Sequence, residues 1–98
     1  MQMAVREKHY LLNYEYVDGM LEKREPYRSD HLARVKEQYE KGVIKTAGAY
    51  GAAEGAVLHF ECDDKQLVDD FAQGDPYLKN GLITSYKIHE WALVFPEQ

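Results

Sequence analysis

Apolar residues along this chain recur with two different periods, and the order in which those periods follow one another restricts the fold. A period of two indicates a strand, whereas recurrence about every three to four residues indicates a helix. The chain shows strand, helix, strand, strand, helix and strand patterns, separated by glycine, proline and aspartate. We predict strands at Lys8–Tyr16, Val43–Tyr50, Ala56–Cys62 and Leu82–Phe95, one helix from near Pro26 to Gly42, and another from Asp63 or Asp64 to Gly74.

This βαββαβ order predicts an α+β fold of the ferredoxin-like type. In such a fold a four-stranded antiparallel sheet carries both helices on one face. The length of 98 residues suits one domain, which we expect to span residues 1–98.

The last predicted strand, Leu82–Phe95, presents large apolar side chains on both faces. Ile83, Trp91, Leu93 and Phe95 fall on one face, and Tyr86, Ile88 and Val94 fall on the other. Helices on one side of a sheet cover only one of these faces. We therefore expect a second copy of the chain to cover the other face in a homodimer, which adds to the modest burial available to a short chain.

The charge of the chain argues against some classes of partner. The formal net charge is −5, and the sequence contains no cluster of lysine and arginine. Nucleic acids and anionic membranes are recognised by concentrated positive charge, so we expect neither as a partner. The apolar stretches are too short to span a bilayer. A single cysteine, Cys62, without a secretory signal indicates a reducing compartment, and we expect a cytoplasmic protein.

His31 is the first candidate for a chemical role. It lies one turn into the first predicted helix, directly before the predicted core residue Leu32, and so at the edge of the buried stripe. The unperturbed pKa of histidine is close to neutrality, which suits a general acid or base. A boundary histidine that only packs and forms hydrogen bonds is the alternative interpretation, and position alone leaves both open.

Asp75 is the second candidate, within the segment Gly74-Asp75-Pro76-Tyr77. Aspartate before proline is a good helix N-cap, because the carboxylate accepts hydrogen bonds from backbone N–H groups that have no partner in the helix. A carboxylate can also hold an imidazole in one tautomer and stabilise its cation. Two carboxylate oxygens allow both roles at once.

Several motifs occur in an order and spacing similar to those of a known family. His9-Tyr10-Leu11-Leu12 leads into Glu25-Pro26-Tyr27-Arg28-Ser29-Asp30-His31-Leu32, then come Gly42, Gly48, Phe71-Ala72-Gln73-Gly74-Asp75-Pro76-Tyr77, Gly81-Leu82 and Glu90-Trp91. From about Lys8 to Phe95 the chain resembles the YciI-like (YCII-related) family. The Arg-x-x-His of the helix and the Asp-Pro-Tyr followed by Gly-Leu are the more specific parts of this resemblance.

The resemblance implies a ferredoxin-like subunit of a dimeric α/β barrel. It also implies an active site in a cleft, with His31 and Asp75 as its catalytic pair. Related dimeric α/β barrels include muconolactone isomerases and monooxygenases. A branch similar to the family removes chloride from a chlorinated hydroxyhydroquinone, so a small-molecule ligand is expected.

Four more residues are candidates for binding such a ligand. Arg28 lies three residues before His31 and is expected to bind an anionic group of the substrate. Tyr14, Ser29 and Tyr77 are expected to line the cleft. The alternatives are a solvated surface arginine for Arg28, and core or interface packing for the tyrosines.

The remaining histidines and the cysteine show no metal-binding pattern. His9, His59 and His89 each lie in a predicted strand, and the sequence has no His-x-His, Cys-x-x-Cys or compact carboxylate cluster with ligand spacing. Cys62 is interpreted as a small buried residue rather than a nucleophile. We expect neither a metal nor another cofactor.

Two functions from different classes follow from these residues. The first is a cofactor-free lyase or isomerase, comparable to a dehydrochlorinase or a muconolactone isomerase, that uses His31 and Asp75 on a small oxygenated substrate, for which an aromatic ring is one option. The second is a non-catalytic dimeric module that binds a small molecule or another protein, in which Asp75 is only a helix cap and His31 only a wall residue.

Overall fold

The structure is a computed structural model and describes residues 9–96. The elements in chain order are β1 (His9–Tyr16), α2 (Met20–Lys23), α3 (Glu25–Glu40), β2 (Ile44–Tyr50), β3 (Gly55–Glu61), α4 (Lys65–Gln73), α5 (Pro76–Lys79) and β4 (Ile83–Glu90). The predicted strands and helices are all found, with ends that differ mostly by a residue or two. Lys8, predicted to begin the first strand, lies outside the described residues.

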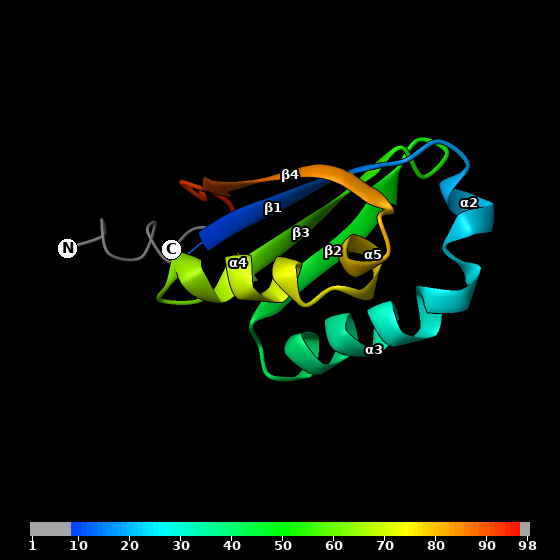
Figure 1. Ribbon diagram of the computed structural model, residues 1–98. Coiled ribbons are helices and arrows are strands. Elements are labelled where there is room, and N and C mark those ends of the chain that lie inside the picture. Colours follow the sequence, from blue (N-terminus) through cyan, green and yellow to red (C-terminus); the bar gives the residue numbers. More distant parts are fainter. Residues whose placement is uncertain (1–8, 97–98) are drawn as a thin grey trace.

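The four strands form one antiparallel sheet in the order β2-β3-β1-β4. Helices α3, α4 and α5 lie on the same side of this sheet (Figure 1). The predicted four-stranded α+β arrangement of the ferredoxin-like type is therefore confirmed for the single chain. None of the helices in residues 9–96 has the length and apolar character needed to cross a membrane.

The core fills the space between the sheet and the helices. Leu12 and Tyr14 of β1 and Phe60 of β3 are fully buried, whereas the alternate residues of these strands are more exposed. Val68 and Phe71 project from α4 onto this surface, and the rings of Phe60 and Phe71 lie 5.3 Å apart, edge to face. This alternation is the two-residue period of the sequence expressed in space.

The helix ends follow the sequence signals. The Asp64 carboxylate accepts a hydrogen bond of 2.9 Å from the backbone N–H of Gln66, so the structure selects Asp64 rather than Asp63 as the cap of α4. Gly42 follows α3 with a φ of 80°, a left-handed conformation that glycine adopts without steric cost.

Strand β4 corrects the prediction for the C-terminal segment. It ends at Glu90 rather than Phe95, because the chain turns tightly where Leu93 N–H donates to the Trp91 carbonyl. A shift in register between Glu15 and Tyr16 of β1 also places Ile83 on the helix side, in the core against which Tyr86 packs. The prediction that Ile83 and Tyr86 face opposite ways was wrong, and the two-sided apolar strand inferred from it is not present.

Candidate active site

His31 is the buried residue of helix α3, with 8% of its surface exposed. The predicted core residue Leu32 is instead 42% exposed, because the helix is rotated so that His31 faces the sheet. Arg34, on the next turn, fixes α3 to α4. Its guanidinium donates to the Phe71 carbonyl at 2.9 Å and lies over the Phe71 ring.

Asp75 lies at the break between α4 and α5 and has no exposed surface. Its Oδ1 accepts a hydrogen bond of 2.9 Å from the backbone N–H of Tyr77, which is the predicted N-cap interaction. Gly74 precedes it, and a Cβ at that position would lie 2.8 Å from Nη2 of Arg34, so a larger residue there would require the Arg34 side chain to move. This capping hydrogen bond therefore fixes the position of the Asp75 carboxyl group next to α3.

The same carboxylate contacts His31. Nδ1 of His31 lies 3.0 Å from each of Oδ1 and Oδ2 of Asp75. A neutral imidazole that donates through Nδ1 carries no proton on Nε2, so Nε2 can accept one. His31 and Asp75 are thus in direct contact. The Asp75 carboxylate can cap α5 and contact the imidazole at the same time.

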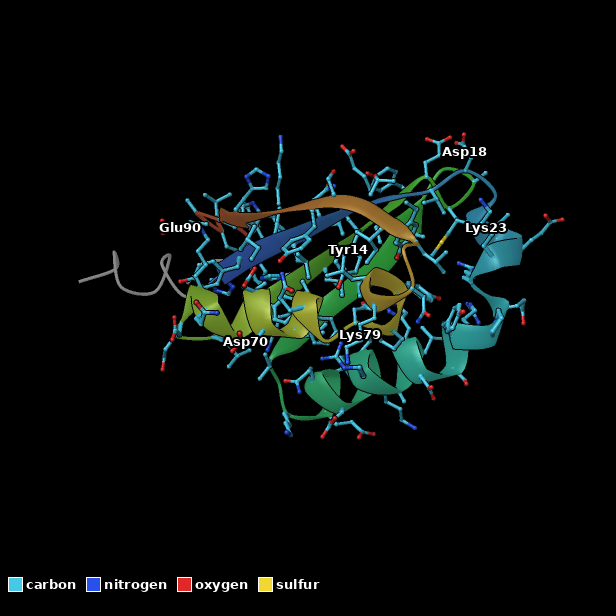
Figure 2. The ribbon with its side chains drawn as sticks, viewed as in Figure 1. Tyr14, Asp18, Lys23, Asp70, Lys79 and Glu90 are labelled. Carbon is cyan, nitrogen blue, oxygen red and sulfur yellow. The ribbon has the colours of Figure 1, made fainter. Side chains whose placement is uncertain are left out.

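Tyr14 completes the surroundings of the carboxylate. Its hydroxyl donates to Oδ2 of Asp75 at 2.8 Å, from the middle of β1. Figure 2 shows Tyr14 between the sheet and the helices. Burial and the nearby Asp75 charge raise the pKa of Tyr14 well above its usual value, so this hydroxyl keeps its proton and remains a donor.

Two further tyrosines shape the site. The ring of Tyr77 stacks on that of His31, with 4.0 Å between ring centres and 12° between the planes. Burial raises the pKa of Tyr77 and also that of Tyr16, whose ring packs edge-to-face against Tyr77. Both therefore remain neutral phenols near neutral pH.

A cavity of about 260 Å³ opens beside His31. It lies between the start of α3 and the strands β2 and β3. Its lining consists of Tyr16, Arg24, Arg28, His31, Leu32, Val35, Ala47, Gly48, Ala49, Ala56, Leu58 and Tyr77. Small residues on the two strands leave room under the helix, so a small molecule can reach the imidazole.

The structure places the other predicted ligand-binding residues differently. Arg28 and Tyr77 line the cavity, and Arg28 is also exposed to solvent, so its contact with a ligand stays a prediction. Tyr14 is buried behind Asp75 and is not part of the lining. Ser29 is exposed on α3 and also lies outside the lining. Neither Tyr14 nor Ser29 is therefore positioned to touch a ligand in this cavity.

Arg24 was not predicted as a site residue, yet it joins Arg28 on the cavity wall. Arg24 stands at the junction of α2 and α3, and its Nε is buried without a hydrogen-bond partner. A signal was available, because Arg24, Arg28 and His31 are spaced four and three residues apart, which places them on one face of a helix.

The other histidines lie apart from this site. Nδ1 of His9 and Nε2 of His59 are 2.9 Å apart, and His59 packs edge-to-face against Trp91. These strand positions alternate with the core residues, so they lie on the sheet face opposite the helices. Among residues 9–96, no group of three or more histidine, cysteine, aspartate or glutamate side chains is arranged to hold a metal ion.

The fold and the site define a class: ferredoxin-like α+β proteins with a buried histidine–aspartate pair beside a small cavity. The model of the YCII-related domain family matches residues 8–92, and the chain belongs to this family. The resemblance seen in the sequence is thereby confirmed.

The chain is also similar to individual proteins, among them an uncharacterised protein and a dehydrochlorinase. An uncharacterised protein of Haemophilus influenzae is 26% identical over an alignment of 97 positions, which covers 89% of this chain and 99% of that protein. The structure of 5-chloro-2-hydroxyhydroquinone dehydrochlorinase from Burkholderia phenoliruptrix, in complex with 2,5-dihydroxybenzoquinone, matches with a TM-score of 0.73 and 25% identity. That match covers 85% of this chain and 92% of the dehydrochlorinase chain.

Proposed function

We propose that this chain is a lyase- or isomerase-type enzyme that moves a proton on a small oxygenated substrate, with a single aromatic ring as the best-fitting class. The observation that carries this proposal is the placement of His31. One ring nitrogen contacts a buried carboxylate, and the ring itself forms part of a cavity wall. A positioned imidazole of this kind is a common general acid or base.

The residues have separate roles in the proposed reaction. Nε2 of His31 takes a proton from an O–H or C–H bond of the substrate. In an elimination, the electron pair of the broken O–H or C–H bond moves toward the carbon that bears the leaving group. The leaving group then departs as an anion. In an isomerisation, His31 returns the proton to a different atom. Asp75 orients the imidazole and stabilises its cation, while Tyr14 and the Tyr77 N–H hold Asp75.

The similar dehydrochlorinase supports this assignment, because its fold matches and the ligand bound in its structure is a small oxygenated ring. Proton transfer and loss of an anion need only an acid–base residue in a position like that of His31, so we propose a reaction without a cofactor.

A substrate screen with a matched pair of variants tests the proposal. Chlorinated hydroquinones and muconolactone-type lactones are offered to the wild type, His31→Ala and Ser29→Ala. Because general acid–base catalysis contributes about 10²- to 10⁴-fold, His31→Ala should lose that much turnover. Ser29 is exposed on the same helix and outside the cavity, so Ser29→Ala should retain full turnover. Turnover that survives in His31→Ala would remove His31 from the mechanism.

The capping bond of Asp75 favours a second candidate, a non-catalytic module that binds a small molecule. In that case the His31–Asp75 contact serves only stability. Asp75→Asn and His31→Gln distinguish the two functions. If both variants lose stability without changing ligand binding, and no substrate is turned over by the wild type, the binding module is the better account.

We also propose that a second copy covers the sheet face opposite the helices. Leu11 and Val57 project from that face and are only partly buried in the single chain, as is Trp91 beyond β4. Partly exposed apolar side chains in the middle of a sheet are typical of a surface that a partner covers.

A further inference from the structure

We propose that the cavity beside His31 takes an organic anion, whose charged oxygen is held by Arg24 and Arg28. This inference rests on the proposed function in one respect only, which is that the ligand occupies this cavity. It specifies the class of ligand as a single-ring carboxylate or phenolate.

The charge of the cavity wall is the first support. The chain has a net charge of −5, yet the lining contains Arg24, Arg28 and His31 and, among residues 9–96, no carboxylate. Asp75 lies behind His31 and does not form part of the wall. A cleft lined by one sign of charge concentrates ligands of the opposite sign, so an acidic protein here presents a site for anions.

The second support is that both guanidinium groups are available. Among residues 9–96, neither Arg24 nor Arg28 forms an ion pair with a carboxylate. The Nε of Arg24 is moreover buried with no hydrogen-bond partner. Buried donors are nearly always satisfied, and an unsatisfied one calls for an explanation such as a missing ligand. A carboxylate or phenolate oxygen in the cavity would form charge-assisted hydrogen bonds with the parts of the Arg24 and Arg28 guanidinium groups that line it.

The positions of Arg24 and Arg28 determine where a bound anion lies relative to the imidazole of His31. Arg24 and Arg28 line the same cavity as Tyr77, and both lower the pKa of the Tyr77 phenol against the larger effect of burial. Tyr77 in turn stacks on His31 at 4.0 Å. An anionic oxygen held by the arginines therefore places the rest of the ligand against the imidazole.

The remaining wall sets the size and polarity of the ligand. Leu32, Val35 and Leu58 provide apolar contacts. The volume of about 260 Å³ lies below the range of about 300 to 1,000 Å³ that is usual for drug-sized ligands. One substituted ring with an anionic group satisfies both constraints.

Binding of matched acids and amides tests the inference. Benzoate is compared with benzamide, and 2,5-dihydroxybenzoate with 2,5-dihydroxybenzamide, by calorimetry up to millimolar concentrations. Each amide keeps the shape of its acid and removes the charge. The wild type should bind at least one acid about tenfold or more tightly than its amide, and Arg24→Gln and Arg28→Gln should each remove about tenfold of that affinity.

Lys23→Gln is the matched control, since Lys23 precedes Arg24, is exposed and lies outside the cavity lining. It changes the net charge equally and should alter acid binding less than about twofold. Arg24→Gln removes a buried donor that has no partner, so its melting temperature should not fall below that of the wild type, which separates ligand binding from a structural role.

Equal binding of acid and amide, an equal loss of affinity in Lys23→Gln, or no binding of either acid would overturn the inference. Acid binding is measured without turnover. Acid binding by a protein that turns over no substrate would therefore refute the proposed function and leave the anion site standing. Turnover by a protein that binds acid and amide equally would refute the anion site and leave the proposed function standing.

Discussion

At the scale of single residues, the site is built from side chains that lie far apart in the sequence. His31 and Asp75 were predictable, because one lies at the edge of the buried stripe of a helix, the other precedes a proline, and the segments around both resemble motifs of the YCII-related family. Tyr14 was expected at the cleft surface, but it donates to Asp75 across 61 positions of the chain. No local pattern reports such a long-range contact, and therefore the role of Tyr14 emerged only from the structure.

Tyr14→Phe should change both stability and its dependence on alkaline pH. The pKa of Tyr14 is raised in the folded protein, so its contribution to stability is fully present below about pH 10 and is lost as the pH rises further, when the unfolded chain ionises first. Near neutral pH, the free energy of unfolding of the variant should be about 1 kcal/mol lower, because the hydrogen bond to Asp75 is missing. Above about pH 10, the free energy of unfolding of the variant should fall with pH less steeply than that of the wild type. The difference between the two slopes should be up to about 1.4 kcal/mol per pH unit.

Urea unfolding at a series of pH values measures both effects. Tyr86→Phe is the control, because its hydroxyl bonds to Gln73 and Asp69 at the surface and not to the site. It should show a smaller change of slope. Identical slopes for Tyr14→Phe and the wild type would contradict the assigned environment of Tyr14.

At the scale of elements, periodicity and end signals located the helices and strands, whereas their rotation and register depended on tertiary contacts. The helix near Pro26 was found, yet its buried residue is His31 rather than Leu32. The last strand was found, yet the register shift beside Tyr16 turns Ile83 toward the core. Both errors arise where packing against another element overrides the local pattern.

The cap of α4 provides a test at this scale. Asp64→Ala should lower the free energy of unfolding by about 0.5–2 kcal/mol, because the Gln66 N–H loses its acceptor. Asp63→Ala, at an exposed neighbouring position without that bond, should change it by less than about 0.5 kcal/mol. Chemical denaturation of both variants distinguishes them, and equal losses would show that the cap does not depend on Asp64.

At the scale of the whole molecule, the βαββαβ order and the single-chain sheet could be predicted, but the cavity could not. The cavity exists because small residues of β2 and β3 lie under the first turns of α3, and Arg24 reaches it only through the corner between α2 and α3. Such a juxtaposition depends on how the elements pack, which the sequence pattern does not specify.

Assembly is also a property of the whole molecule. Sedimentation at micromolar concentration should give the mass of two chains, since a second copy is proposed to cover the face that carries Leu11 and Val57. Leu11→Lys should shift the protein toward the monomer, because it places a charge on that face. A wild-type protein that sediments as a monomer would contradict the proposed dimer.

The central claim is that His31 and Asp75 act as one unit in proton transfer. A double-mutant cycle on kcat/KM with His31→Gln and Asp75→Asn tests it most directly, because asparagine is also a good N-cap and keeps α5 in place. Each single variant should lose about 10²- to 10⁴-fold, and the double variant should be within a few-fold of the more impaired single variant. Losses that multiply in the double variant, or an Asp75→Asn enzyme with full activity, would contradict the claim.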